Sequence, residues 1–314
     1  MTLLKKVNNK VYSILIDTLN TLIVNLTKER FPKLEVNFIE NKRIDTENSR
    51  GIVVTTFEKR FFSSALPLIH QLRDAGIDYP IIIVINGNLD GNHNQDLRQK
   101  FISELAKFTN LGVVTNFRFS GISRHWNLGI QLLGTESVAC FSDDLVVSRH
   151  FKNELESVFE AVKVAGLVTI EGFAAFAITR ELIDEIGWFD ERFLGFGEED
   201  GDYVWRYIKR FEKDPPRFKS FSLVHQNLQS RGDEVAGISK YSLFNLAWRK
   251  TKYVENSEGI FGYFTRQQIQ RVSDIDYHPM ETFRRKNREL LLEAKEDTIL
   301  SQISNQGDVD KNVF

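Results

Sequence analysis

The sequence predicts an α/β domain in which a mainly parallel β-sheet is flanked by helices. Short apolar runs alternate with helical patterns from residue 51 onward, as in βαβ units. One run, Ile81–Ile85, contains only β-branched residues and ends at Asn86-Gly87-Asn88, which is typical of a buried strand followed by a turn. Another run, Val138–Phe141, stops at Ser142-Asp143-Asp144. Because parallel strands end at a common edge, where ligands bind in such sheets, these polar residues mark a candidate site.

The remaining elements follow in chain order. Strands are expected at 51–55, 81–85, 111–115 and 138–141. Helices are expected from Ser63 or Ser64 to Gly76 with Pro67 in the first turn, across 97–108, from a cap at Ser123 to Gly134, and across 155–162. Two strand-like pieces broken at Glu171-Gly172 come next, then a helix over 180–186, a loop over 188–197, a helix over 198–210, and a strand over 218–224 ending at His225.

Length and composition fit one large domain with helical additions at both ends. The chain has 314 residues, of which 42% are hydrophobic, so it can bury a sizeable core. We divide it into an N-terminal amphipathic helix and linker (1–50), the α/β domain (51–238) and a C-terminal helical extension (239–314). The N-terminal apolar stretch, Val11 to Leu26, is interrupted by polar residues and too short to span a membrane. Packing against the domain is favoured, and peripheral membrane contact stays an alternative.

Charge and cysteine content exclude some classes of protein. A formal net charge of −2 gives no electrostatic basis for binding nucleic acid. The basic run Arg284–Arg288 fits a solvated helix face better. The single cysteine, Cys140, excludes an intrachain disulfide and fits a buried side chain in a cytoplasmic protein. The oligomeric state cannot be predicted from the sequence.

Two acidic groups and a histidine are candidates for chemistry. Asp143 and Asp144 repel each other unless a positive group lies beside them, and a divalent cation holding a phosphate-bearing ligand would supply it. Four carboxylates within Glu198–Asp202 exceed what capping a helix requires, so one of them is a candidate general base. His225, at a strand end, would suit a cation such as Mn²⁺. The alternatives are a simple turn, simple capping and a core histidine.

The order of the motifs resembles glycosyltransferase family 2 and related GT-A enzymes over residues 50–235. The motifs that carry the resemblance are Gly121-x-x-Arg124-x-x-Asn127-x-Gly129, Phe141-Ser-Asp-Asp144, Gly187-Trp-Phe-Asp-Glu-Arg-Phe193, Glu199-Asp200-Gly-Asp202 and His225. Gly195-Phe-Gly-Glu-Glu-Asp200 is also similar to the Glu-Asp loop of galactosyltransferases with this fold. The resemblance implies a Rossmann-like GT-A fold. It also implies a metal-dependent, inverting transferase that moves a sugar from a nucleotide-diphosphate sugar, with UDP favoured. The acceptor would be a glycan or another hydroxyl acceptor, including a lipid-linked or protein-linked one.

The resemblance also implies roles for individual residues. Asp144 and His225 would hold Mn²⁺ or Mg²⁺, Asp143 would contact the ribose or the waters of the ion, Asp200 would be the catalytic base, and Glu199 would orient the acceptor hydroxyl. Thr55, Thr56 and Glu58 match nucleotide contacts, Arg124 and Asn127 either contact the nucleotide or are solvated, and Asn86 begins the turn that replaces an acidic turn of the family. Ser142 replaces the first aspartate of the Asp-x-Asp motif.

Two other functions stay open at this point. A sugar-phosphate nucleotidyltransferase uses a similar sheet and metal, but it would call for a glycine-rich basic loop after the first strand. The corresponding segment, Thr55–Phe61, contains no glycine. A non-catalytic carbohydrate-binding protein could keep the fold, although Asp144, Asp200 and His225 favour an enzyme, for which polysaccharide biosynthesis is the expected setting.

Overall fold

The computed structural model describes residues 34–37, 49–87, 94–116, 119–193 and 195–226, together with Asn245 and Arg249. The predicted helices over 11–26 and 282–300 lie outside the described residues. So do most of the two proposed extensions.

A seven-stranded sheet forms the centre of the fold, in the order β1-β4-β3-β2-β5-β8-β7. Its strands are β1 (Leu34–Asn37), β2 (Arg50–Phe57), β3 (Ile81–Asn86), β4 (Leu111–Asn116), β5 (Ser137–Ser142), β7 (Leu167–Thr169) and β8 (Ala175–Thr179). The four neighbours β4, β3, β2 and β5 are parallel, whereas β1 and β8 run against them. β7 is antiparallel to β8 and so returns to the main direction. This topology confirms the predicted α/β class with a mainly parallel, Rossmann-like sheet.

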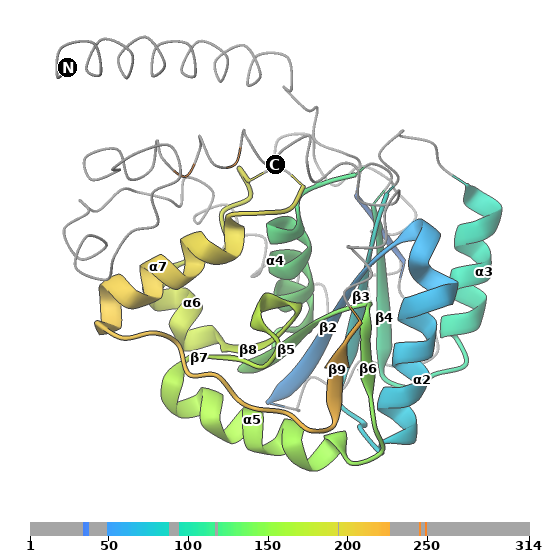
Figure 1. Cartoon of the computed structure of the whole chain (residues 1–314). Helices are drawn as coiled ribbons and strands as arrows, with labels where there is room; N and C mark the ends of the chain where they lie inside the picture. The colour runs from blue at the N-terminus through green and yellow to red at the C-terminus, as the bar shows by residue number, and fades with distance from the viewer. Residues whose placement is uncertain are drawn as a thin grey trace, which may run out of the picture.

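Helices cover both faces of the sheet (Figure 1). One face is covered by α2 (Leu66–Asp74), α3 (Gln95–Leu105) and α5 (Phe151–Ala165), the other by α4 (Ile122–Leu133), α6 (Arg180–Ile186) and α7 (Glu199–Phe211). Ile81, Ile83 and Ile85 of β3 point into the first layer, and Ile82 and Val84 into the second. Both faces of the strand are therefore buried, which explains its unbroken apolar sequence.

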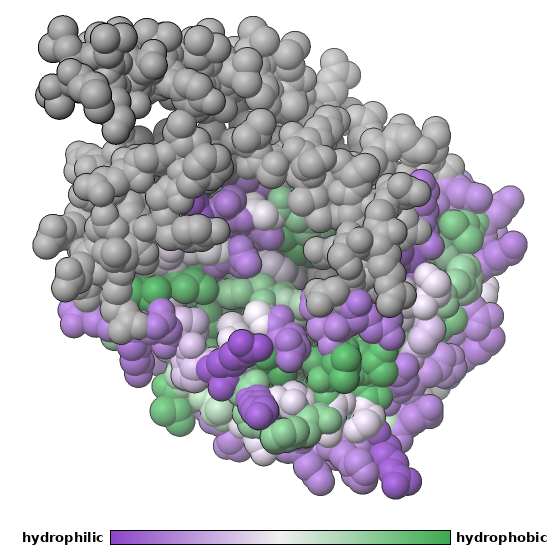
Figure 2. All heavy atoms as spheres, viewed as in Figure 1, coloured by the Kyte–Doolittle hydropathy of each residue, from purple (hydrophilic) through white to green (hydrophobic). Residues whose placement is uncertain are grey.

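Most large apolar side chains of the described residues are buried. Phe62, Val164, Phe221 and Val224 are the large hydrophobic residues exposed there. On the face shown in Figure 2, hydrophobic areas are bordered by hydrophilic side chains. The buried Cys140 packs in the α4 layer, as predicted.

The start of α4 differs from the prediction. Its N-cap is Gly121, and Ser123 lies inside the helix, so the predicted cap at Ser123 is wrong. The N–H of Ile122 donates instead to the carbonyl of Gly195, 2.9 Å away. A Cβ at position 121 would lie 2.4 Å from the carbonyl oxygen of Phe193. Only glycine therefore allows the backbone of Phe193 to approach this closely. The contact places the loop before α7 against the start of α4.

Other boundaries also depend on long-range contacts. Pro67 lies in the first turn of α2, as predicted, but a π-helical turn, Phe61–Ala65, comes before the helix. β1 joins the sheet from the segment predicted to be a linker. The strand predicted over 218–224 is wrong in extent, because β9 covers only Leu223–His225. β9 pairs with β6 (Leu145–Val147) in a separate two-stranded sheet.

Candidate active site

A pocket of about 340 Å³ opens at the carboxyl edge of the parallel strands. It is lined by Thr55, Thr56, Phe57, Arg60, Asn86, Ile122, His125, Trp126, Ser142, Asp143, Asp144, Glu171, Phe173, Ala174, Phe196, Gly197, Glu199, Asp200 and His225. Its size is within the range of small-molecule sites, and its position is the one at which such sheets bind ligands.

Strand register brings the first group of side chains together. Thr55 of β2 is the partner of Ser142 of β5, and Phe57 is the partner of Asn86 of β3. Asp143 and Asp144 form the turn between β5 and β6. Because β6 pairs with β9, the turn lies next to His225, and the N–H of Gln226 donates to the carbonyl of Asp144 at 2.9 Å. The pairing of β6 with β9 therefore brings together Asp144 and His225, which are 81 positions apart in the sequence.

Arg60 is the positive group that the aspartate pair requires. Its Nη2 lies 2.7 Å from Oδ1 of Asp143 and 3.7 Å from Oδ2 of Asp144, and all three side chains are buried. Burial raises the pKa of Asp143 to about 7, although Arg60 and the hydroxyl of Thr56, 2.7 Å from Oδ2, oppose the shift. The turn therefore holds two buried aspartate side chains whose charged forms are stabilised by a nearby positive charge.

Asp144 and His225 fit a divalent cation. Oδ2 of Asp144 and Nε2 of His225 are buried, have no hydrogen-bond partner and lie 3.1 Å apart. Two neighbouring ligands at about 2.1 Å from one ion are separated by roughly this distance. The hydroxyl of Ser142 donates to Oδ1 of Asp144 at 2.5 Å, which orients the carboxylate. Among the described residues no group of three or more His, Cys, Asp or Glu side chains could hold a metal ion. An ion held by Asp144 and His225 would therefore need oxygens of a ligand and of water as its further ligands.

The acidic start of α7 supplies the second chemical group. Glu199 is buried, its Oε2 has no hydrogen-bond partner, and burial together with Asp200 raises its pKa to about 8. Asp200 is only half-buried, and its Oδ1 accepts the N–H of Gly201 at 2.7 Å. Backbone N–H groups of Glu199 and Gly197 donate to the Glu199 carboxyl and oppose the rise in its pKa, so capping accounts in part for both carboxylates. The two carboxyl groups have different environments, as acid and base pairs in active sites do.

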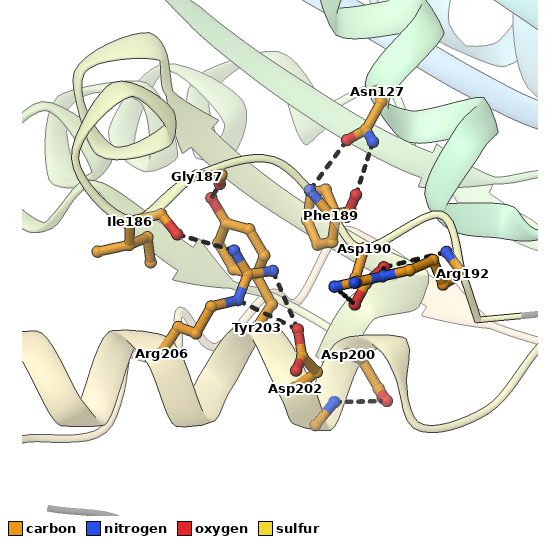
Figure 3. A network of polar contacts seen from close by, with 11 residues as sticks. Asn127, Ile186, Gly187, Phe189, Asp190, Arg192, Asp200, Asp202, Tyr203 and Arg206 are labelled. Carbon is orange, nitrogen blue, oxygen red and sulfur yellow. Dashed lines mark hydrogen bonds and ion pairs between the residues drawn. The ribbon is translucent and has the colours of Figure 1, made fainter. Parts of the chain in front are cut away.

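Figure 3 shows the polar network that holds the loop before α7. Nδ2 of Asn127 donates to the carbonyl of Phe189 at 2.8 Å, and the N–H of Phe189 donates to Oδ1 of Asn127 at 3.1 Å. Asp202 and Arg206 form a fully buried ion pair at 3.1 Å on α7. Arg206 also donates to the carbonyl of Ile186, and the hydroxyl of Tyr203 donates to that of Gly187. Asp202 is therefore a structural residue of the acidic cluster.

The structure gathers most of the predicted site residues but not all. Thr55, Thr56, Asn86, Asp143, Asp144, Glu199, Asp200 and His225 line the pocket. Glu58, Arg124 and Asn127 do not line it, and all three are buried. The alternative that Arg124 or Asn127 is solvated is therefore wrong, and Asn127 braces Phe189 instead. Asn86 also joins two loops, since its amide exchanges two hydrogen bonds of 3.0 Å with the backbone of Ser120.

The sequence prediction missed several residues that line the pocket. Arg60 lies in the segment after the strand predicted over 51–55, so its place near the carboxyl edge of the sheet could have been predicted from the sequence. His125 follows Arg124 in the first motif. It contacts the Ser120 hydroxyl at 2.8 Å, and burial, reinforced by Arg124, lowers its pKa to about 3, so it is neutral. The aromatic wall of Trp126, Phe173 and Phe196 had no local signal, because packing decides which aromatics face the pocket.

Comparison with solved structures gives fold-level similarities of low sequence identity. A mannosyltransferase from Pyrobaculum calidifontis, solved with GDP-Man and Mn²⁺, has a TM-score of 0.46 and 12% identity, covering 93% of this chain and 86% of that one. Glucosyl-3-phosphoglycerate synthase from Mycobacterium tuberculosis, solved with Mn²⁺ and UDP, has a TM-score of 0.45 and 14% identity, covering 67% and 83%. Residues 1–349 of TarS from S. aureus, solved with UDP, have a TM-score of 0.44 and 10% identity, covering 80% and 88%.

A longer TarS structure is matched over only 36% of its length. No family model and no curated protein sequence matches this chain. None of the helices in the described residues has the length and apolar character needed to cross a membrane.

Proposed function

We propose that this chain is a metal-dependent, inverting glycosyltransferase that uses a nucleotide-diphosphate sugar. The observation that carries the proposal is that one pocket holds two kinds of chemistry. Asp144 and His225 offer a cation site at one part of its lining, and Glu199 with Asp200 offers acid–base groups at another. A binding protein would need neither buried, unpaired ligand atoms nor a carboxyl with raised proton affinity.

Each group then has a distinct task in transfer. Asp144 and His225 would hold Mn²⁺ or Mg²⁺, and such an ion would supply positive charge for the diphosphate of the donor. Thr55, Thr56 and Asn86, at the ends of β2 and β3, lie where the nucleoside would contact the pocket, and we favour uridine. Asp200 removes the proton from the acceptor hydroxyl as its oxygen attacks the anomeric carbon opposite the leaving nucleotide. A single displacement of this kind inverts the anomeric centre.

The remaining lining favours a hydroxyl-bearing acceptor such as a glycan. Glu171 and Glu199 can accept hydrogen bonds from hydroxyl groups, and Phe173 and Phe196 offer aromatic surface for a sugar ring. A lipid-linked or protein-linked glycan would present the same hydroxyl groups. Synthesis of a polysaccharide in the cytoplasm is the setting that we propose for this activity.

Thermal unfolding in the presence of nucleotide sugars tests the proposal. We expect one nucleotide sugar, with Mn²⁺ present, to raise the Tm, whereas the same compound without the ion raises it less. An acceptor screen with that donor should then release the nucleoside diphosphate. Release of pyrophosphate from a nucleoside triphosphate and a sugar phosphate would indicate a nucleotidyltransferase instead. Binding of glycans without any donor or turnover would indicate a carbohydrate-binding protein.

The raised pKa of Glu199 predicts how transfer depends on pH. Because its pKa is about 8, Glu199 keeps its proton at neutral pH and can donate a hydrogen bond that orients the acceptor. We expect the rate of transfer to fall as the pH rises above about 8 and Glu199 ionises. Glu199→Gln keeps a donor but cannot ionise, so it should flatten this alkaline decline. If Glu199 is itself the base, the wild-type rate will instead rise through pH 8, and Glu199→Gln will abolish transfer.

A further inference from the structure

The residue before the two catalytic carboxylates has an unusual backbone conformation. Glu198, the N-cap of α7, has φ 77° and ψ −17°. These angles lie in the left-handed region, which residues other than glycine rarely adopt. It follows Gly195 and Gly197, which also have positive φ values of 60° and 104°. The loop therefore has wide conformational freedom of its own, and Glu198 makes no side-chain capping bond. Contacts from elsewhere must hold this conformation.

Two residues of the C-terminal segment supply these contacts. Arg249 forms an ion pair with Glu198, and its guanidinium lies over the ring of Trp205, 4.5 Å from the ring centroid. Nδ2 of Asn245 donates to the carbonyl oxygens of Gly197, at 2.9 Å, and Phe196, at 3.3 Å. Asn245 and Arg249 are both buried, and both have helical backbone, four positions apart.

The pair holds the loop on both sides of the strained residue. Asn245 fixes the two peptides before Glu198, and Arg249 fixes its side chain against α7 through Trp205. Neither residue lines the pocket, whereas the next residues, Glu199 and Asp200, both do. The direction in which these carboxylates enter the pocket is set by the backbone of Glu198 immediately before them.

We propose that Asn245 and Arg249 are positioning residues for the acidic start of α7 and so help to form the active site from outside the pocket. The proposal rests on the function proposed above, in which Glu199 and Asp200 act on the acceptor. Arg249 and Asn245 orient these carboxylates without touching substrate. Their removal lets the loop relax to a conformation in which the carboxylates no longer meet the acceptor.

Arg249→Met tests the proposal because it keeps much of the side-chain volume but loses the ion pair. We expect kcat to fall about 10- to 100-fold, the effect of a small misplacement of reacting groups. The KM for the donor should stay within about twofold, since the donor contacts lie on β2, β3 and the aspartate turn. Arg249→Lys keeps the charge but not the planar stacking on Trp205, so it should recover only part of the rate. Glu198→Gln removes the same ion pair from its other side and should show the same pattern.

Amide hydrogen exchange of residues 195–201 gives a readout that does not depend on activity. Arg249→Met should speed exchange there and leave exchange in β2 and β5 unchanged. The matched control is Arg210→Met, which removes an exposed ion pair with Glu185 at the far end of α7 and should change neither kcat nor exchange in the loop. If Arg249→Met fails to fold, Glu198→Gln carries the test.

Unchanged kcat together with unchanged exchange in residues 195–201 would overturn the proposal. So would a loss of donor binding equal to the loss of kcat, because that result indicates a general structural role. If the wild-type chain shows no transfer with any donor, the proposed function fails, but the exchange experiment still decides whether Arg249 holds the loop.

Discussion

Replacing Asp144 with alanine should abolish metal-dependent donor binding and lower the rate of transfer by about 10³-fold or more. Asp144 is buried, and its Oδ2 accepts no hydrogen bond. This oxygen lies 3.1 Å from Nε2 of His225. Without this carboxylate, His225 would be the one remaining ligand of the proposed pair, whereas Arg60 would keep Asp143 as its partner. Isothermal titration of the donor with and without Mn²⁺ measures the effect directly.

Two further variants control this experiment. Asp144→Asn keeps the shape of the side chain and loses the charge, so it should behave like Asp144→Ala if charge is what matters. Ser142→Ala removes only the hydroxyl that orients Asp144, 2.5 Å from Oδ1, and should weaken binding about 10- to 100-fold. Unchanged calorimetric affinity in Asp144→Ala, in a protein with wild-type Tm, would contradict the assignment of the cation site.

Replacing Asp200 with asparagine should lower kcat by about 10²- to 10⁴-fold while donor affinity stays the same. The physical reason is that asparagine keeps the size and hydrogen-bonding reach of the side chain but cannot accept a proton. Asp200 is the more exposed of the two carboxylates at the start of α7, and the N–H of Gly201 holds one of its oxygens at 2.7 Å. Its other oxygen is left to meet an acceptor hydroxyl in the pocket.

The test combines steady-state kinetics with titration of the donor. Glu212→Gln, at the exposed far end of α7, is the matched control and should leave kcat unchanged. A near-normal rate in Asp200→Asn would show that another group is the base. In that case Glu199→Gln should lose activity instead, and the wild-type rate should rise through pH 8.

Local patterns were sufficient to predict the sheet and much of the pocket. The unbroken apolar run Ile81–Ile85 is typical of a strand buried on both faces, and Ser142-Asp143-Asp144, directly after Val138–Phe141, marks the end of a strand. The ends of parallel strands converge at one edge, so Thr55, Asn86 and the aspartates come together whatever the details of packing.

Directions of side chains on helices could not be predicted in the same way. Asn127 belongs to a motif with apparent nucleotide-binding character, yet it turns toward Phe189 and away from the pocket. Ser123 was predicted to cap the helix, but the carbonyl of Gly195 accepts the N–H of Ile122, one residue earlier. In both cases a partner more than 60 positions away in sequence decides the outcome, and a local pattern does not contain it.

By itself, the sequence determined the alternation of strands and helices, the edge at which polar residues gather, and the acidic identity of the site, because periodicity and turn chemistry act over a few neighbouring residues. Tertiary structure alone decided that Arg60 forms an ion pair with Asp143, that β9 brings His225 to Asp144, and that Asn245 and Arg249 contact the loop before Glu199. These are contacts between distant segments. Burying a charged group costs free energy unless a partner lies beside it, and these partners come together only when the chain folds.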